Sequence, residues 1–253
     1  MSTGTLFTNI TNSVATVTFG HPASNAFPGE QLQRFIDTIN RLSDDDSIGV
    51  IVIKSEGDKS FCAGAFFDEL MAVTNEADGT RFFAGFGQLM LAMKNCSKFI
   101  VARVQGKAVG GGVGIIAASD YCFATEAADV KLSELSVGLG PFVIAPALER
   151  KIGVSGLSEL ALDPGNWKNA YWAKEKGLFS RVFENIREMD DAVELFTEKL
   201  AAYSPRAKKE LKKILWHGTG DWATLMPEYA AINGKLVLSE ETKLALQAFK
   251  NRI

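Results

Sequence analysis

Two glycine-containing segments carry the residue types that could stabilise a negative charge with backbone amides. They are Phe61-Cys62-Ala63-Gly64-Ala65 and Gly110-Gly111-Gly112-Val113-Gly114. Glycine at a strand-to-helix turn lets a ligand approach the backbone closely, and the first N–H groups of the helix are unpaired. Two such turns at the ends of neighbouring strands would direct two donors at one oxyanion. The alternative is that both segments are tight packing turns.

The second glycine segment also matches a dinucleotide-binding pattern. Gly112-Val-Gly114-Ile-Ile-Ala117 has the G-x-G-x-x-A form, after a predicted strand and at the start of a predicted helix. That pattern requires an acidic residue about 20 residues further on, at the end of the next strand. Glu126 ends that strand too early, and Asp129 and Glu134 lie beyond its end. The spacing therefore disfavours a nicotinamide-dependent oxidoreductase.

Alternating strands and helices must position these two segments. Apolar residues at helical spacing predict helices around residues 32–42 and 82–93. Runs rich in β-branched and aromatic residues predict strands at Leu6–Ile10, Val14–Phe19, Gly49–Lys54, Phe99–Gln105, Tyr121–Ala124 and Leu178–Glu184, the first two forming a hairpin. This alternation predicts an α/β fold with a mainly parallel sheet.

The last quarter of the chain is predicted to be helical. Ser204-Pro205 and Ser239-Glu240-Glu241-Thr242 have the composition of helix starts. We expect Leu244, Leu246 and Phe249 to be buried, and the lysines at 208, 209, 212 and 213 to form a solvated face. The predicted organisation is an α/β core over residues 1–190 and a helical C-terminal segment over residues 191–253.

Composition excludes several classes of protein. The chain has 253 residues, of which 47% are hydrophobic and 23% charged, so it is not disordered. Its net charge of −3 argues against nucleic acid or a membrane surface as a partner. Three cysteines without CxxC spacing indicate a reducing compartment, with the thiols packed as small hydrophobic groups. We expect no metal site. No Lys or Arg precedes Arg34, unlike a secretory signal, so we expect a cytoplasmic protein.

Several spaced motifs together resemble the enoyl-CoA hydratase/isomerase (crotonase) family. They are Lys59 to Ala65, Val104 to Gly112, Asp120, Ala173 to Phe183 and the C-terminal Ser239 to Phe249. Asn25-Ala26 is also similar to the family, and the resemblance covers nearly the whole chain. It implies a spiral of ββα units with the helical tail at a trimer interface, commonly in a dimer of trimers.

The resemblance implies an acyl-CoA thioester substrate, with coenzyme A entering as part of the substrate and no separate cofactor. It also implies that the backbone N–H groups of Ala63 and Gly111 form an oxyanion hole. Removing the proton next to a thioester builds charge on the carbonyl oxygen, which such donors stabilise. The same resemblance indicates substrate-binding positions at Asn25, Ala65, Phe66, Phe67, Gly110, Gly138, Pro141 and Phe142.

The acid/base residues depart from the pattern of the hydratases in this family, which carry two glutamates around a water molecule. The first of these positions is Gly114 here, and the second is Glu134. A single glutamate resembles the Δ3,Δ2-enoyl-CoA isomerases, and Gly138 to Phe142 is also closer to their sequence. One base can take a proton from C2 and return it to C4, whereas hydration also needs a placed water. Asp68 or Glu69 could substitute for the missing carboxylate.

The sequence thus favours a Δ3,Δ2-enoyl-CoA double-bond isomerase with Glu134 as the general acid/base. A hydratase or dehydratase of the same family is the first alternative. A family member that binds acyl-CoA or forms oligomers without turnover is the alternative from another class. For Glu134 itself, the alternative is a surface carboxylate at the end of a short strand.

Overall fold

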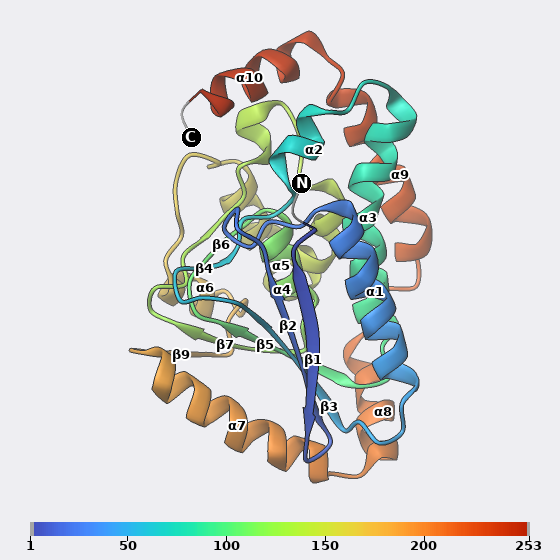
Figure 1. Cartoon of the computed structure of the whole chain (residues 1–253), viewed down its shortest axis with the longest axis vertical. Coiled ribbons are helices and arrows are strands. Elements are labelled where there is room, and N and C mark those ends of the chain that lie inside the picture. Colours follow the sequence, from blue (N-terminus) through green and yellow to red (C-terminus); the bar gives the residue numbers. More distant parts are fainter. Residues whose placement is uncertain (1–2, 252–253) are drawn as a thin grey trace.

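Two β-sheets form the frame of the molecule in the computed structural model, which describes residues 3–251 (Figure 1). The larger sheet has the strand order β1-β2-β3-β5-β7-β9, and the smaller has the order β4-β6-β8. The strands are β1 (Thr5–Thr11), β2 (Val14–Gly20), β3 (Val50–Ser55), β4 (Ser60–Cys62), β5 (Phe99–Val104), β6 (Lys107–Val109), β7 (Tyr121–Thr125), β8 (Val130–Lys131) and β9 (Arg181–Phe183). Within these sheets, β1 and β2 form the expected antiparallel hairpin and all other pairs are parallel.

From β3 to β8, successive strands along the chain alternate between the large sheet and the small sheet. The pairs β3 and β4, β5 and β6, and β7 and β8 follow this rule. Strands β3 and β5 are predicted apolar runs and are buried on both faces, whereas β1 at the edge of the sheet is largely exposed. Strands β4 and β6 were not predicted, because three residues give no periodicity, whereas β8 and β9 lie where the sequence indicates short strands at residues 130–132 and 178–184. The α/β fold and its spiral of ββα units are confirmed.

Helices cover both sheets. They are α1 (Gly29–Asp44), α2 (Phe67–Met71), α3 (Glu76–Asn95), α4 (Gly111–Ala118), α5 (Ala145–Ala161), α6 (Ala170–Glu175), α7 (Ile186–Ala202), α8 (Pro205–Leu215), α9 (Trp222–Leu236) and α10 (Glu240–Lys250), with 3-10 turns η1 (Glu134–Val137) and η2 (Phe142–Ile144). Ser204 and Ser239 cap α8 and α10 as predicted, each accepting a hydrogen bond from the amide three residues on. None of these helices combines the length and apolarity needed to cross a bilayer, within residues 3–251.

The start of the helical part of the chain lies earlier than predicted. The expected boundary between residues 190 and 191 falls inside α7, which begins at Ile186. Helix α7 packs along the outer face of the large sheet (Figure 1), where Met189 and Val193 join a small apolar cluster with strand residues. It therefore belongs structurally to the sheet as well as to the helical segment.

The last two helices return to the other end of the molecule. Helix α9 lies along α3, and α10 crosses the end of the molecule near α2 (Figure 1). The ring centroids of Phe67 in α2 and Phe249 in α10 are 5.4 Å apart. Leu246 is buried as expected, whereas Leu244 and Phe249 are 66% and 40% exposed. The C-terminal helices thus pack on their own chain.

The prediction of a solvated lysine face on α8 is half wrong. Lys209 and Lys213 are exposed, but Lys208 and Lys212 are only 8% and 3% exposed. The Lys208 ammonium donates to three backbone carbonyls, including that of Gly49 at 3.0 Å. Lys212 forms a buried ion pair of 3.0 Å with Asp120. A four-carbon stem lets lysine cross an apolar interface and reach polar groups beyond it, which periodicity does not reveal.

Candidate active site

A cavity of about 650 Å³ opens between the glycine turns and the C-terminal helices. Its wall is mainly apolar and includes Phe66, Phe67, Leu70, Phe82, Phe83, Phe86, Val137, Leu139, Val143, Ile144, Leu246 and Phe249. Among the described residues, the titratable side chains that line it are Glu134, Asp68 and Lys250. A deep apolar cavity with few polar groups is the usual form of a small-molecule site.

The two glycine turns meet at one wall of this cavity. Gly64 has a φ of +85°, and a β-carbon there would lie 3.0 Å from the Val109 carbonyl oxygen and 3.4 Å from the Gly111 nitrogen. The Cys62 side chain packs under Gly112, where a β-carbon would be 2.7 Å from the Cys62 Cβ. Burial raises the pKa of the Cys62 thiol to about 12, so it serves as packing and not as a nucleophile. The predicted juxtaposition of the two turns is therefore present.

The structure corrects the expected donor in the first turn. The Ala63 amide already donates to the Ser24 carbonyl at 3.1 Å, so it is unavailable to a ligand. The Ala65 amide donates to no group within residues 3–251, because the bridge between Phe27 and this segment uses the Gly64 carbonyl and the Phe66 amide. Ala65 also lines the cavity. The free donor of this turn is thus Ala65.

A second free amide lies at the start of α4. Gly110 has a φ of +52° and precedes the helix, so the Gly111 amide is one of its unpaired first donors. Within the described chain, that amide makes no hydrogen bond, and Gly111 lines the cavity beside Ala65. A β-carbon on Gly111 would come within 2.1 Å of the Phe86 ring, which fixes the shape of this wall.

Glu134 begins η1 and directs its carboxyl group at the second turn. A β-carbon on Gly110 would lie 2.7 Å from Glu134 Oε1, so the glycine leaves room for the carboxyl group. Glu134 Oε2 is buried, and no hydrogen-bond partner for it is found in residues 3–251. Burial raises the pKa of this carboxyl from its usual 4.5 to about 7. A buried carboxyl group with a near-neutral pKa, in the same cavity as two free amides, is suited to general acid/base chemistry.

The position of the missing first glutamate is filled by apolar side chains. Gly114 is buried in α4, and a β-carbon there would lie 2.5 Å from Ile144 Cγ2 and 3.6 Å from Met90 Sδ. Asp68, a candidate substitute, lines the cavity from α2. Glu69 accepts a hydrogen bond of 2.8 Å from the Gly29 amide at the start of α1, so it is engaged elsewhere.

The substrate-binding positions expected from the sequence divide into two groups. Ala65, Phe66, Phe67, Gly110 and Pro141 line the cavity, whereas Gly138 and Phe142 do not. Gly138 ends η1 with a φ of +78°, and the Phe142 ring lies against Gly140. Both therefore shape the adjoining loop and do not form the cavity wall.

Asn25 is also corrected to a structural role. Its Oδ1 accepts from the His21 amide at 3.0 Å, and its Nδ2 donates to the carbonyls of Glu56 at 2.8 Å and Ser60 at 2.9 Å. These bonds hold a loop whose neighbouring residues Ser24 and Ala26 line the cavity. The side chain of Asn25 is thus occupied within the fold.

Sequence reasoning missed the contributions of α3, α9 and α10 to the cavity. The helix predicted around residues 82–93 is part of α3, and its Phe83 and Phe86 are buried and also line the cavity. Asn233 of α9 and Leu246 of α10 complete the wall. A helical period reports which face is buried but not whether a cavity adjoins it.

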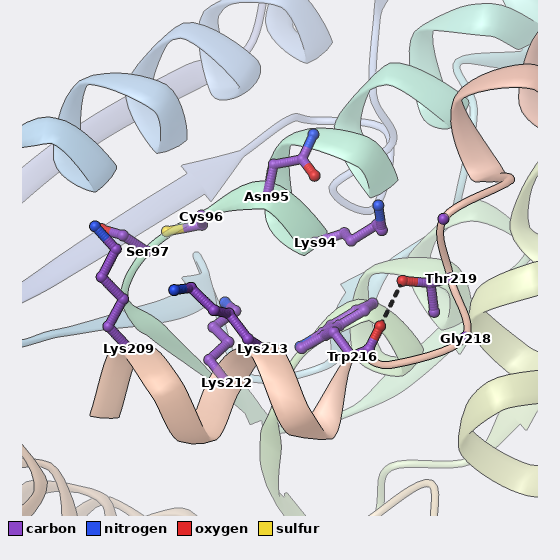
Figure 2. A pocket seen from close by; sticks show the side chains of 11 residues that line it. Lys94, Asn95, Cys96, Ser97, Lys209, Lys212, Lys213, Trp216, Gly218 and Thr219 are labelled. Carbon is purple, nitrogen blue, oxygen red and sulfur yellow. Dashed lines mark hydrogen bonds between the residues drawn. The ribbon is translucent and has the colours of Figure 1, made fainter. Parts of the chain in front are cut away.

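A second hollow, of about 440 Å³, lies between the end of α3 and α8 (Figure 2). Lysines line it, but Lys212 is paired with Asp120, and Lys213 is 2.8 Å from Glu210. Figure 2 shows the Thr219 hydroxyl donating to the Trp216 carbonyl at its edge. The acceptors of Asp120 are also occupied, by Lys212, the Ile100 amide and the Trp216 indole. Lys212 and Lys213 of this hollow are thus engaged in ion pairs within the fold.

The cavity thus brings two free backbone amides and one buried carboxyl group to a largely apolar wall, and comparisons with known proteins place the chain in a family. The Enoyl-CoA hydratase/isomerase family model matches residues 9–252. The Δ(3,5)-Δ(2,4)-dienoyl-CoA isomerase of Arabidopsis thaliana is 24% identical over 257 residues, covering 95% of this chain and 91% of that protein. The short-chain-enoyl-CoA hydratase of Clostridium acetobutylicum is 28% identical over 239 residues, covering 93% of this chain and 90% of that protein. The chain belongs to the enoyl-CoA hydratase/isomerase family.

Solved structures support the fold. The crystal structure of enoyl-CoA hydratase from Bacillus halodurans superposes with a TM-score of 0.88 at 21% identity, covering 96% of this chain and 99% of that one. Relatives of low identity include both isomerases and hydratases, so the particular reaction must be argued from the site.

Proposed function

We propose that this protein is a Δ3,Δ2-enoyl-CoA isomerase that uses Glu134 as its single general acid/base. The observation that carries the proposal is the filled position at Gly114. Ile144 and Met90 occupy the space where a hydratase of this family would hold its first glutamate. The Glu134 carboxyl group then stands alone beside the oxyanion donors, which suits a proton shuttle better than activation of water.

The proposed reaction moves one proton and one double bond. The Glu134 carboxylate removes a proton from C2 of a 3-enoyl thioester, and the C–H electron pair becomes part of a dienolate. The amides of Ala65 and Gly111 stabilise the charge on the thioester oxygen. The protonated carboxyl group then returns a proton to C4, which places the double bond between C2 and C3. The pKa of Glu134, about 7, suits a group that must accept and donate the proton in turn.

The cavity wall supports an apolar acyl group on the substrate. Phe66, Phe67 and Phe86 face a space in which polar side chains are few. A hydrocarbon chain gains about 0.8 kcal/mol for each methylene group that it buries. Coenzyme A would enter as part of the substrate, so the proposed reaction requires no resident cofactor.

Hydration of a 2-enoyl-CoA is the second candidate, and Asp68 is the observation in its favour. It is a second carboxylate on the cavity wall and could place a water molecule. Incubating the protein separately with a 3-enoyl-CoA and a 2-enoyl-CoA separates the candidates. The proposal expects conjugation of the first substrate, seen as ultraviolet absorbance of the conjugated thioester, and its loss in Glu134→Gln.

Efficient hydration of the 2-enoyl-CoA without isomerisation of the 3-enoyl-CoA would replace the proposal by the second candidate. Binding of both thioesters without turnover of either would favour the non-catalytic alternative. Asp68→Asn is the matched control for Glu134→Gln in the isomerisation assay, because it removes the other carboxylate of the same cavity. Isomerisation should survive this change and should not survive Glu134→Gln.

The assignment of Ala65 as an oxyanion donor can be tested by replacing single backbone amides with esters. Lactic acid in place of Ala65 removes its N–H and keeps its methyl group. We expect kcat to fall about 10²- to 10³-fold, the usual effect of removing one oxyanion donor. The same replacement at Ala63 removes the bond to Ser24 and should lower stability more than kcat. The reverse pattern would restore Ala63 as the donor.

The trimeric assembly expected from the resemblance is also a proposal. Ile214 and Leu215 of α8 are 69% and 50% exposed, and such side chains commonly pack in subunit contacts. Light scattering of the purified protein should give the mass of a trimer or hexamer. A monomer at micromolar concentration would contradict this expectation.

A further inference from the structure

Two buried side chains from the C-terminal helices hold the loop that follows Glu134. Asn233 of α9 accepts from the Gly140 amide at 3.1 Å and donates to the Gly140 carbonyl at 2.8 Å. The Thr242 hydroxyl of α10 donates to the Gly138 carbonyl at 3.1 Å. Asn233 and Thr242 are each 1% exposed. The backbone amide and the backbone carbonyl of Gly140 are therefore both hydrogen-bonded by the single side chain of Asn233.

The loop is in turn bonded to Glu134. The Leu139 amide donates to the Glu134 carbonyl at 3.0 Å, and the Gly138 amide donates to the Leu135 carbonyl at 3.2 Å. Leu139 lies between the two glycines that the C-terminal helices hold. A shift of the loop would therefore move the backbone of Glu134 through this bond.

The hydroxyl group of Thr242 is itself oriented. The Ser239 hydroxyl donates to it at 3.0 Å and also accepts from the Thr242 amide at 3.2 Å at the start of α10. A β-carbon on Gly138 would lie 2.4 Å from Thr242 Oγ1, so the glycine permits this close contact. The helix cap and the loop form one continuous hydrogen-bonded unit, at the end of the molecule where α10 crosses (Figure 1).

We propose that Asn233 and Thr242 are positioning residues that set the place of the Glu134 carboxyl group relative to the oxyanion donors. The inference rests on the proposed function of Glu134. A displacement of about 1 Å in a catalytic group can lower the rate about 10²-fold. Holding the loop at two points therefore protects the rate by keeping Glu134 in place. The C-terminal helices thus complete the active site of their own chain.

The test compares variants that remove these hydrogen bonds with matched controls. Asn233→Leu removes both bonds to Gly140 at similar size, and Thr242→Val removes the hydroxyl group and keeps the shape. Thr242→Ser retains the hydroxyl group. Thr197→Val is the control for losing a buried hydroxyl elsewhere, since Thr197 donates to the Val193 carbonyl within α7. Circular dichroism and thermal melting establish that each variant is folded.

We expect kcat for the 3-enoyl-CoA to fall about 10- to 100-fold in Asn233→Leu and Thr242→Val, with KM changed less than threefold. Thr242→Ser and Thr197→Val should retain most of kcat. Folded Asn233→Leu and Thr242→Val proteins with the kcat of the original chain would overturn the proposal. So would an equal loss of kcat in Thr197→Val, because it would indicate a general structural effect.

A second readout does not depend on the reaction. Carbon-13 NMR of glutamate-labelled protein can follow the titration of the Glu134 carboxyl, assigned by its absence in Glu134→Gln. We expect its midpoint to move in Asn233→Leu and Thr242→Val and to stay in Thr197→Val. An unchanged midpoint in both loop variants would refute the positioning role. If the original protein isomerises no substrate, this titration still tests the inference separately from the proposed function.

Discussion

Replacing Glu134 with Gln should change how stability depends on pH, by an amount that follows from the site. Burial raises the pKa of this carboxyl from 4.5 to about 7. The folded state therefore holds the proton more tightly than the unfolded state. Its stabilising contribution is complete below pH 4.5 and is lost as the pH rises through 7. At 1.36 kcal/mol for each pKa unit, the loss is about 3 kcal/mol.

Urea denaturation of the two proteins between pH 4.5 and pH 8 measures this loss. The free energy of unfolding of the original protein, minus that of Glu134→Gln, should fall by about 3 kcal/mol over the range. Other titrations cancel in the difference, and equal protomer concentrations cancel the effect of assembly. Glu210→Gln is the control, because Glu210 is exposed beside Lys213. If this difference in the free energy of unfolding varies by less than about 0.5 kcal/mol between pH 4.5 and pH 8, burial does not raise the pKa of Glu134 as described.

Three further predictions test the surroundings of this site. Because Glu134 must be ionised to accept the C2 proton, kcat/KM should fall tenfold for each pH unit below about 7, and a flat profile from pH 5 to 8 would contradict its role. Gly114→Glu should lower the free energy of unfolding by about 1–3 kcal/mol, because the new side chain would overlap Ile144. Adding Ile144→Ala should restore part of the lost stability. An unchanged melting curve for Gly114→Glu would show that the space beside Gly114 is open. Lys212→Met should lower the free energy of unfolding by about 3–5 kcal/mol, because it leaves the buried Asp120 carboxylate without its ion-pair partner. The exposed Lys213→Met should lower it by less than about 1 kcal/mol. Equal losses of the two variants in urea denaturation would contradict the buried ion pair.

The sequence predicts the frame of the site because its signals are local. β-branched runs such as Gly49–Lys54 specify buried strands, and the glycines around Gly111 specify a turn that can expose a helix start. Gly114 and Glu134 were singled out from the same motifs, and the structure shows Gly114 packed against Ile144 and the pKa of Glu134 raised by burial. These features depend on few residues that are close in the chain.

The parts that the sequence did not predict depend on contacts between distant segments. Whether Ala63 or Ala65 offers a free amide is decided by the Ser24 carbonyl, far away in the chain. Asn25 looks like a binding residue, but its amide group is occupied by backbone groups of three other residues. Periodicity along one helix contains no information about such partners.

The C-terminal helices show the same limit. Asn233 has no sequence motif, and its role appears only when α9 lies against the Gly140 loop. Lys212 has the pattern of a surface lysine and yet is paired with Asp120 in the interior. An isolated polar residue in an amphipathic helix gives no signal of a buried partner, so its contribution must be found in three dimensions.

The most direct test of the central claim is the conversion of a 3-enoyl-CoA that carries deuterium at C2. A single carboxyl group that takes the C2 proton and returns it to C4 predicts a conjugated product with part of the label at C4, detected by mass spectrometry and NMR. Glu134→Gln should form this product at least about 10²-fold more slowly. Conjugation at an undiminished rate in Glu134→Gln, or a hydrated product without conjugation from the original protein, would contradict the account.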